Sequence, residues 1–364
     1  MPEMTDWGYT GGSAGEKWKN SGLLVSRIVR VHRERFEAVC EKGFVWALPK
    51  AGAYFRGVES VEFPAVGDFV LLQYNGAGES LIVETLPRKT LFARSDLNTR
   101  KAGHGRVSVE QVIAANFDEV CILMSLNQNY NARRLERYAA LAWASGARPA
   151  VVLTKADLME DKEKSAYLAE AMRLAPGARV FALSAVTGEG MEEFRAFLES
   201  GKTFVLLGSS GVGKSSLVNA LMGEAAAVCG EVREDDARGR HTTTHRELFM
   251  LPGGAMAIDT PGMRELGILD ADEGLTAAFS EIEALMGRCR FSNCTHTSEP
   301  GCAVQRAIHS GALDRARWDS FRSLTKENRA AKRKKEAVKQ REKNASKRED
   351  RPRDRAYKRL GDEA

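Results

Sequence analysis

The stretch that decides the fold is GSSGVGKSS, residues 208–216. An apolar run typical of a buried strand precedes it, and the pattern of a helix follows up to Met222, with Gly223 at its end. Glycines in such a loop let backbone amides close around phosphates at a helix N-terminus. The context predicts a phosphate-binding loop rather than a chance glycine turn. The residues expected at the ligand are Gly208, Ser209, Ser210, Gly211, Val212, Gly213, Lys214, Ser215 and Ser216.

Two side chains of this loop are expected to carry chemistry. Lys214 is predicted to reach the β and γ phosphates and to act in catalysis, and the Ser215 hydroxyl to bind Mg²⁺. The loop indicates a nucleoside triphosphate, but it does not select the base.

The base is selected by a second motif, Thr154-Lys155-Ala156-Asp157, at the end of another predicted strand. It resembles the Asn/Thr-Lys-x-Asp motif of GTPases, in which the aspartate accepts the N1 and N2 protons of guanine. Adenine lacks those protons and would leave a carboxylate unpaired, so Asp157 favours guanine. By itself the tetrapeptide fits a loop before a helix N-cap equally well. Ser184-Ala185, also at a strand end, resembles the motif that backs the guanine ring.

Asp259-Thr260-Pro261-Gly262 resembles the start of a switch II segment. There Asp259 would hold Mg²⁺ through water, and the Gly262 amide would meet the γ-phosphate. Residues 238–244, RGRHTTT, occupy the place of switch I, where Thr243 is the favoured Mg²⁺ ligand and either neighbouring threonine is an alternative.

The motifs lack the usual residue that orients the attacking water, because no Gln follows Gly262 within the next four residues. His241 is the best candidate for that role, with a structural or substrate-binding histidine as the alternative. We therefore expect slow basal GTP hydrolysis that a bound partner accelerates.

The order of the motifs is permuted, because the base motifs precede the phosphate loop. Between about Val112 and Leu269, strand and helix patterns alternate, which predicts a mainly parallel sheet covered on both faces. In such sheets ligands bind beyond the carboxyl ends of the strands, so a circular permutation can preserve the site. The predicted strands are Glu119–Ser125, Pro149–Thr154, Val180–Ser184, Thr203–Leu207 and Ala255–Asp259.

Short β-branched and aromatic runs between Gly22 and Arg94 predict a small β-barrel ahead of this domain. An oligonucleotide-binding (OB) barrel is favoured, although another five- or six-stranded barrel fits the composition. The expected fold is thus multidomain α/β. Its parts are a flexible leader (1–21), an OB-like barrel (22–94), a circularly permuted GTPase domain (112–274), a helical zinc-binding domain (275–325) and a basic tail (326–364).

Four soft ligands cluster in the C-terminal part as Cys-x4-Cys-x-His-x5-Cys. Three thiolates and one imidazole fit a closed tetrahedral Zn²⁺ site with a structural role. Unrelated free cysteines are the alternative. The ligands would be Cys289, Cys294, His296 and Cys302.

Charge is unevenly distributed along the chain. Residues 326–359 hold 16 Lys/Arg and 6 Asp/Glu, a net of +10, whereas the rest holds 38 basic and 43 acidic residues. Such a segment predicts a solvated helix or disordered arm that suits a polyanion, with a non-functional tail as the alternative. The sequence has no apolar run long enough to span a membrane, and we expect a cytoplasmic protein.

Together the motifs resemble the bacterial small-ribosomal-subunit biogenesis GTPases (RsgA-like) over about residues 22–325, including Val66-Gly67-Asp68 and the stretch 111–118. The resemblance implies an OB barrel, binding to the 30S subunit near its decoding region, ribosome-stimulated hydrolysis of GTP to GDP, and a role late in subunit maturation. It also implies that the barrel and zinc domains contact 16S rRNA. Thr154 in place of Asn, the leader and the long tail depart from the family pattern.

Two other functions remain open at this point. A large-subunit assembly GTPase shares the motif order but is expected to have neither barrel nor zinc cluster. A regulatory GTP-binding protein fits a slow site but leaves the flanking domains and basic tail without a partner. We expect a monomer.

Overall fold

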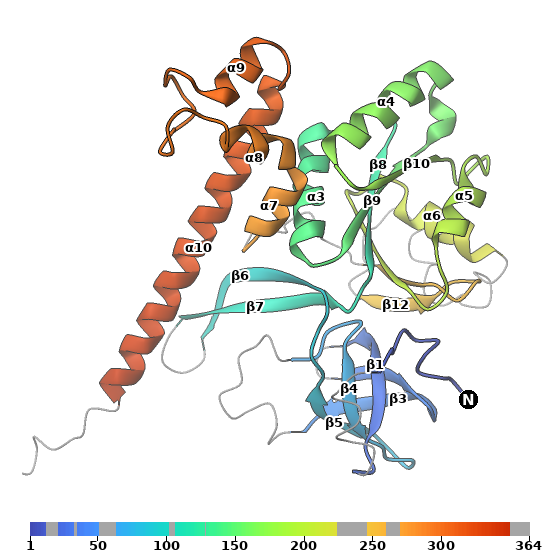
Figure 1. The fold of residues 1–364 in the computed structure, drawn as a ribbon. Helices are drawn as coiled ribbons and strands as arrows, with labels where there is room; N and C mark the ends of the chain where they lie inside the picture. Colours follow the sequence, from blue (N-terminus) through green and yellow to red (C-terminus); the bar gives the residue numbers. More distant parts are fainter. Residues whose placement is uncertain are drawn as a thin grey trace, which may run out of the picture.

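The structure is a computed structural model that describes residues 1–11, 21–32, 35–50, 63–101, 106–127, 129–223, 246–259 and 270–349. One 11-stranded sheet runs through the GTPase region and on into the N-terminal barrel (Figure 1). Its strand order is β10-β9-β8-β11-β13-β12-β1-β2-β3-β5-β4. The two domains therefore share a hydrogen-bonded sheet.

The N-terminal barrel closes because β1 pairs with β4 as well as with β2. All pairs in it are antiparallel except β3 with β5. Alternate side chains fill the interior, among them Ile28, Val70 and Ile82, all fully buried. The expected OB-like barrel is confirmed. Its strands are β1 (Leu24–Val31), β2 (Phe36–Cys40), β3 (Gly43–Pro49), β4 (Phe69–Gln73) and β5 (Ser80–Thr85).

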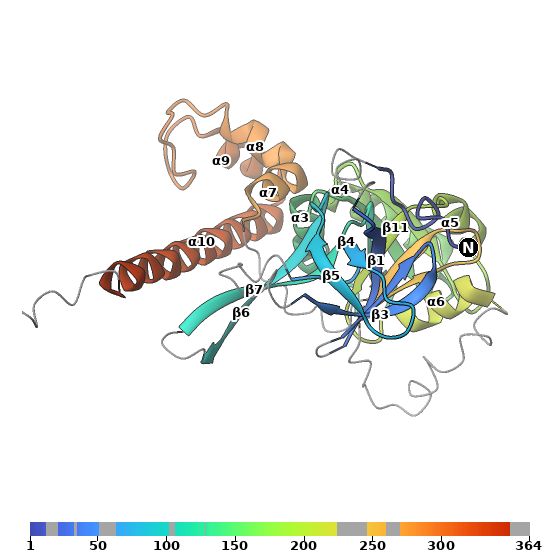
Figure 2. The same cartoon turned by 90° about the horizontal axis from the view of Figure 1, so that it is seen from below.

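A long hairpin that the sequence analysis missed joins the barrel to the GTPase region. Its strands are β6 (Leu91–Lys101) and β7 (Arg106–Ala115), so the expected limits at 94 and 112 fall inside it. The alternation of valines at 107 and 109 was a signal for a strand. The hairpin projects from the body beside the C-terminal helix (Figure 2).

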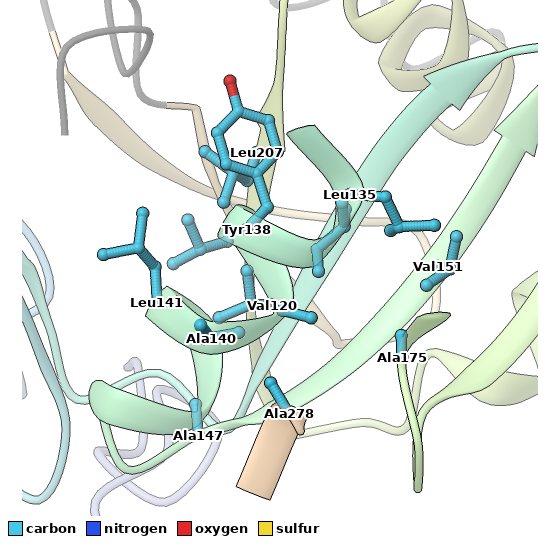
Figure 3. Packing of buried hydrophobic residues seen from close by; sticks show 14 of the residues in the cluster. Val120, Leu135, Tyr138, Ala140, Leu141, Ala147, Val151, Ala175, Leu207 and Ala278 are labelled. Atoms are coloured by element: carbon cyan, nitrogen blue, oxygen red, sulfur yellow. The ribbon is translucent and has the colours of Figure 1, made fainter. Parts of the chain in front are cut away.

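The GTPase sheet is parallel except for β12, and helices cover both of its faces, as expected. On one face, alternate residues such as Val120 and Val151 pack against α3, with Leu135 and Tyr138 (Figure 3). The intervening residues of the strands pack against α5 and α6 on the other face. The strands are β8 (Glu119–Ser125), β9 (Arg148–Thr154), β10 (Arg179–Leu183), β11 (Thr203–Gly208), β12 (Glu247–Met250) and β13 (Met256–Asp259), and the helices are α3 (Ala132–Ala144), α4 (Asp161–Leu174), α5 (Met191–Phe197) and α6 (Lys214–Met222).

The C-terminal part is helical and is fixed to the GTPase domain through α3. Gly274 lies so close to α3 that an added Cβ would be 2.2 Å from the Ala140 carbonyl. Arg317, 3% exposed, pairs with Glu136 of α3 at 3.0 Å. The basic segment 326–349 continues helix α10, the helical alternative of the sequence analysis. These helices are α7 (Asp272–Ala278), α8 (Ser280–Met286), α9 (Ala303–His309) and α10 (Arg315–Glu349). In the described residues, no helix has the length and apolarity that crossing a membrane requires.

A buried arginine lies where the barrel meets the GTPase domain. Arg27 of β1 is 1% exposed and donates to the carbonyls of Gly67 (3.3 Å), Trp7 (2.5 Å) and Asn116 (2.8 Å). Its guanidinium also lies 4.8 Å from the centre of the Phe69 ring. Burial lowers the pKa of Arg27 to about 10, so the group stays charged at neutral pH. Its hydrogen bonds join the N-terminus, the barrel and the start of the GTPase domain.

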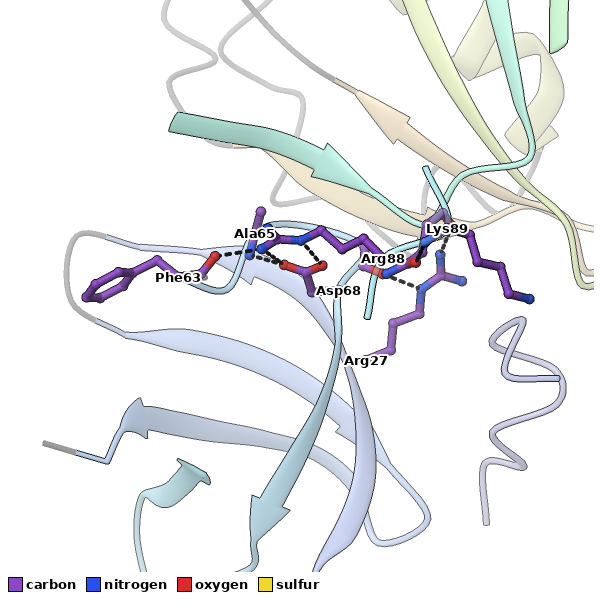
Figure 4. Close-up of polar contacts among 8 residues, drawn as sticks. Arg27, Phe63, Ala65, Asp68, Arg88 and Lys89 are labelled. Atoms are coloured by element: carbon purple, nitrogen blue, oxygen red, sulfur yellow. Dashed lines mark hydrogen bonds and ion pairs between the residues drawn. The ribbon is translucent and has the colours of Figure 1, made fainter. Parts of the chain in front are cut away.

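A buried ion pair stabilises the loop next to this arginine (Figure 4). Asp68 accepts from Arg88 Nε (2.7 Å) and Nη2 (2.6 Å) and from the Ala65 amide (2.7 Å). Burial raises the pKa of the Asp68 carboxyl, and Arg88 offsets part of that rise. Gly67 has a φ of +89°, and an added Cβ there would lie 2.1 Å from the Ala115 carbonyl. The Val66-Gly67-Asp68 motif thus lies in the contact between the barrel and the GTPase domain.

The first residues of the expected leader pack against the body in the part that the structure describes. Trp7 is 8% exposed and makes an edge contact with Phe44 at 5.7 Å between ring centres. Tyr9 contacts Phe69 at 5.2 Å. Residues 12–20 lie outside the described residues. Residues 4–9 therefore belong to the interface between barrel and GTPase domain.

Replacing Trp7 by alanine is expected to destabilise the protein by about 3 kcal/mol, because a large buried ring leaves the interface and its contact with Phe44 is lost. Urea unfolding of the full chain measures this change. Thr5→Ala, an exposed change in the same segment, is the control and should alter stability by less than about 0.5 kcal/mol. Equal stability of the two variants would show that Trp7 does not fasten the segment.

Candidate nucleotide-binding site and metal centre

The expected nucleotide motifs gather at one edge of the GTPase sheet. β9, β10, β11 and β13 run parallel, and each ends at one of the motifs. Leu206 of β11 is in register with Asp259, so the phosphate loop and the start of switch II are neighbours. The permuted order of the chain therefore still brings these segments together.

The phosphate loop leads from β11 into helix α6, with Gly213 as the N-cap at φ 96° and Gly211 at φ 74°. Both are left-handed conformations that glycine adopts without strain. No side chain caps α6 and its first turn has no acidic residue, so its amides suit an anion. Lys214 Nζ donates to the Gly208 carbonyl at 2.9 Å, which places the ammonium over the loop. These residues fit a polyphosphate.

The first base motif is bonded directly to the phosphate loop. Thr154, 3% exposed, donates its hydroxyl to the Val212 carbonyl at 2.6 Å. Lys155, in a left-handed conformation at φ 60°, donates to the Gly211 carbonyl at 2.9 Å. Thr154 stands where Asn is more common in this motif. Its hydroxyl nevertheless forms a hydrogen bond that positions the phosphate loop.

The other residues of the base motifs lie in two short turns at the same edge. Ala156 is buried at the start of a single 3₁₀ turn, Ala156–Leu158, and Asp157 is exposed there. Ser184 is fully buried, and its hydroxyl accepts the Val186 and Thr187 amides, each at 3.2 Å. This turn places half-buried Ala185 at the end of β10. The roles of these residues in binding are predictions from the sequence.

Asp259 is the last residue of β13 and lies at the expected edge. The other switch predictions, His241, Thr243 and Gly262, lie outside the described residues. They remain predictions from the sequence.

The sequence analysis missed Asn129, which lies against the phosphate loop. Its Nδ2 donates to Ser209 Oγ at 3.2 Å and to the Ser210 carbonyl at 3.5 Å. Arg134 of α3 donates to Asn129 Oδ1 at 2.9 Å, which fixes the orientation of the amide. The polar residues directly after the buried strand β8 were an available signal, because this sheet edge carries the ligand.

The cysteine cluster forms a compact group in the segment between α8 and α9. The four ligand atoms of Cys289, Cys294, His296 and Cys302 lie within 4.8 Å of one another. Cys289 Sγ is 3.4 Å from His296 Nδ1 and 3.9 Å from Cys302 Sγ. A tetrahedral zinc site with ordinary bond lengths requires about 3.6 Å between S and N and about 3.8 Å between two S atoms. The group therefore fits a tetrahedral metal ion with no open position.

Neighbouring groups hold these ligands in place. The Ala303 amide donates to Cys289 Sγ at 3.4 Å, and the Gln305 side chain donates to the His296 carbonyl at 2.6 Å. The imidazole meets the Trp318 ring of α10 edge-on at 5.8 Å. The cluster is thereby linked to the long helix.

Comparison with known proteins identifies the family. A sequence model of the RsgA GTPase family matches residues 85–269, which include the phosphate loop and both base motifs. The chain belongs to the RsgA GTPase family. As a member it is a P-loop enzyme that hydrolyses GTP, and its motif order makes it a circularly permuted one.

Curated relatives support this membership over most of the chain. The small ribosomal subunit biogenesis GTPase RsgA 2 of Lactiplantibacillus plantarum is 40% identical over 324 residues, 89% of each chain. The RsgA protein of Streptomyces coelicolor is 43% identical and covers 88% of this chain and 85% of its own. Both alignments extend well beyond the matched GTPase segment.

Two solved structures share the fold of this chain. The crystal structure of YjeQ from Thermotoga maritima has a TM-score of 0.61 at 24% identity and covers 83% of this chain and 97% of its own. The structure of YloQ, described as a circularly permuted GTPase, has a TM-score of 0.58 at 22% identity, with coverage of 85% and 96%. At these identities the match shows the fold alone.

Replacing Thr154 by alanine is expected to weaken GDP binding roughly fivefold, because about 1 kcal/mol is lost when the Val212 carbonyl loses its buried donor. Thr154→Ser keeps the hydroxyl and is the matched control, with an affinity within about twofold of the wild type. Fluorescent GDP titration measures both. Equal affinities of the two variants would contradict a loop-positioning role for this hydroxyl.

Proposed function

We propose that this enzyme hydrolyses GTP to GDP and phosphate when it is bound to the 30S ribosomal subunit, and that it acts late in small-subunit assembly. The observation that carries the proposal is the permuted GTPase site between a barrel and a Cys₃His centre. Relatives that are 40% and 43% identical over most of the chain are named small ribosomal subunit biogenesis GTPases.

At the nucleotide, we propose one role for each of the residues that the sequence motifs single out. Asp157 accepts the guanine protons, Ser184 and Ala185 back the ring, and the amides of the phosphate loop hold the phosphates. Lys214, already over the loop, offsets charge on the β and γ phosphates as the bond to the leaving GDP breaks. His241 positions the water that attacks the γ-phosphate.

Mg²⁺ fits this arrangement, because Ser215 opens α6 and Asp259 ends the adjacent strand. When bound, the ion neutralises charge on the β and γ phosphates. Ser215 and Thr243 would offer hydroxyls to it, Asp259 would hold it through water, and the Gly262 amide would meet the γ-phosphate. Zn²⁺ would be held by the Cys₃His group and would stabilise the region that carries α9 and the start of α10.

The outer domains offer surfaces suited to 16S rRNA. On the barrel, Trp46 is 42% exposed, and its ring contacts the guanidinium of Arg35 and the ring of His32. Aromatic rings beside cations stack on unpaired bases. Helix α10 carries the basic residues of 326–349 away from the body, and these suit phosphates (Figure 2). We further propose that the enzyme acts as a monomer in the cytoplasm, where subunits are assembled.

Addition of 30S particles is expected to raise the GTPase rate at least tenfold, whereas 50S particles leave it near the basal value. The readout is phosphate release at saturating GTP. Stimulation by 50S alone would favour a large-subunit role, and stimulation by neither would favour a regulatory GTP-binding protein.

Asp157→Asn supplies the control for base recognition. Xanthine has a carbonyl where guanine has its 2-amino group, and an asparagine amide can donate to that carbonyl. The variant should lose 30S-stimulated hydrolysis of GTP and regain it with xanthosine triphosphate.

Replacing Cys294 by serine is expected to lower bound zinc from about one ion per chain to near zero and to reduce the melting temperature, because the closed site loses a thiolate. Elemental analysis of the purified protein measures the metal. Cys40→Ser removes a buried thiol outside the cluster and should leave the zinc content unchanged. Full zinc in the Cys294 variant would contradict the assignment.

A further inference from the structure

Five residues lie in register across five neighbouring strands, from the barrel surface to the nucleotide edge. Trp46 of β3 is opposite Glu37 of β2, and Glu37 is opposite Arg30 of β1. Arg30 is opposite Glu247 of β12, and Glu247 is opposite Asp259 of β13. Every pair is antiparallel, and residues directly opposite in such pairs share a face. We call this set the cross-sheet row.

Arg30 holds the middle of the cross-sheet row. Its guanidinium bonds Glu37 at 3.3 Å on the barrel side and Glu247 on the GTPase side. Burial alone would lower the pKa of Arg30, but the two carboxylates outweigh it and raise that pKa. Arg30 is 33% exposed, and Glu37 and Glu247 are 18% and 20% exposed, so the group is partly shielded from water. Its charges therefore act on one another more strongly than surface charges do.

The GTPase end of the row places two carboxylates opposite each other. Glu247 and Asp259 form a direct cross-strand pair, and like charges in such a pair repel. The bond from Arg30 offsets the charge of Glu247. The position of Arg30 thus decides how much of that charge acts on Asp259, the proposed magnesium aspartate.

The barrel end of the row is open to a partner. Trp46 is 42% exposed, and Arg35 lies 5.6 Å from its ring centre. An unpaired base that stacks on this ring would press on β3, which is bonded through β2 to β1. In sequence, β12 and β13 lie between the two expected switch segments, so movement of β1 would reach the hairpin that joins them.

We propose that Arg30 and Glu247 are positioning residues that couple RNA bound at Trp46 to Asp259 and so contribute to stimulation of GTP hydrolysis. The inference rests on the proposed 30S-stimulated activity. RNA on the barrel shifts β1 and Arg30, the charge of Glu247 at Asp259 changes, and the magnesium aspartate takes its active position. Neither residue belongs to the motifs assigned to the nucleotide.

The test compares Glu247→Gln with Glu37→Gln in the full chain. Each substitution removes one carboxylate charge from Arg30, at nearly equal exposure, but only Glu247→Gln cuts the link to the GTPase domain. We expect Glu247→Gln to lower the ratio of 30S-stimulated to basal kcat about fivefold, the low end of coupling between two sites. Glu37→Gln should keep the ratio within about twofold. Both are measured at saturating GTP and 30S particles.

A second readout separates positioning from simple loss of structure. In the wild type, 30S particles should shift the Mg²⁺ concentration that gives half-maximal rate, and in Glu247→Gln they should not. Arg30→Gln, a change on the barrel strand β1, should lower the ratio of 30S-stimulated to basal kcat as Glu247→Gln does. Arg30→Lys, which keeps the charge, should retain most of the stimulation. Melting temperatures confirm that each variant is folded.

The outcomes are distinct for the two proposals. A wild type that 30S particles do not stimulate overturns the proposed function and this inference with it. A stimulated wild type with equal ratios for Glu247→Gln and Glu37→Gln overturns the inference alone. Unequal ratios, with an abolished magnesium shift in Glu247→Gln, support it.

Discussion

The relative placement of the domains depends on one buried charge. Arg27 is 1% exposed, and a charge in that position is costly unless hydrogen bonds satisfy it. Its partners are carbonyls of Trp7, Gly67 and Asn116, which come from the N-terminus, the barrel and the entry to β8. All three segments must be in place for the guanidinium to stay buried. The arginine therefore fixes where the barrel lies relative to the GTPase sheet.

That constraint explains why the sheet can continue from one domain into the other. Arg27 and Arg30 lie on the same strand, β1, and the irregularity between Ile28 and Arg30 lets both side chains project to one face. Arg27 holds the domains together, and Arg30 bonds β12 beside the nucleotide edge. A barrel tied to the GTPase domain by a flexible linker alone would not transmit strain in this way.

The circular permutation gives the C-terminal region its position. Switch II precedes α7 in the chain, and Gly274 of α7 packs on the last turn of α3, around Ala140 and Ala144. The buried ion pair between Arg317 of α10 and Glu136 of α3 lies in this interface. Asn129, in the loop before α3, donates a hydrogen bond to Ser209 of the phosphate loop. The nucleotide site thus has neighbours from the barrel through β12 and from the metal-centre helices through α3.

Most of the fold could be predicted from the sequence. Periodicity predicted the barrel and placed the main GTPase strands to within one or two residues, because alternating burial leaves a local pattern. The hairpin β6–β7 was missed, as was β12, since short or irregular strands are stabilised by their pairing partners. The candidate site was predicted where motifs are contiguous, as in residues 208–216, but the contacts of Asn129 were not.

The sequence by itself determined the chemistry. The glycines of the phosphate loop, Asp157 and the Cys₃His spacing act through local geometry that neighbouring residues specify. Only the tertiary structure decided that Arg27 is buried, that the Trp7 carbonyl accepts its hydrogen bond, and that five strands bring Trp46 into line with Asp259. These features depend on contacts between residues far apart in the chain, and no local pattern records which distant strands will pair.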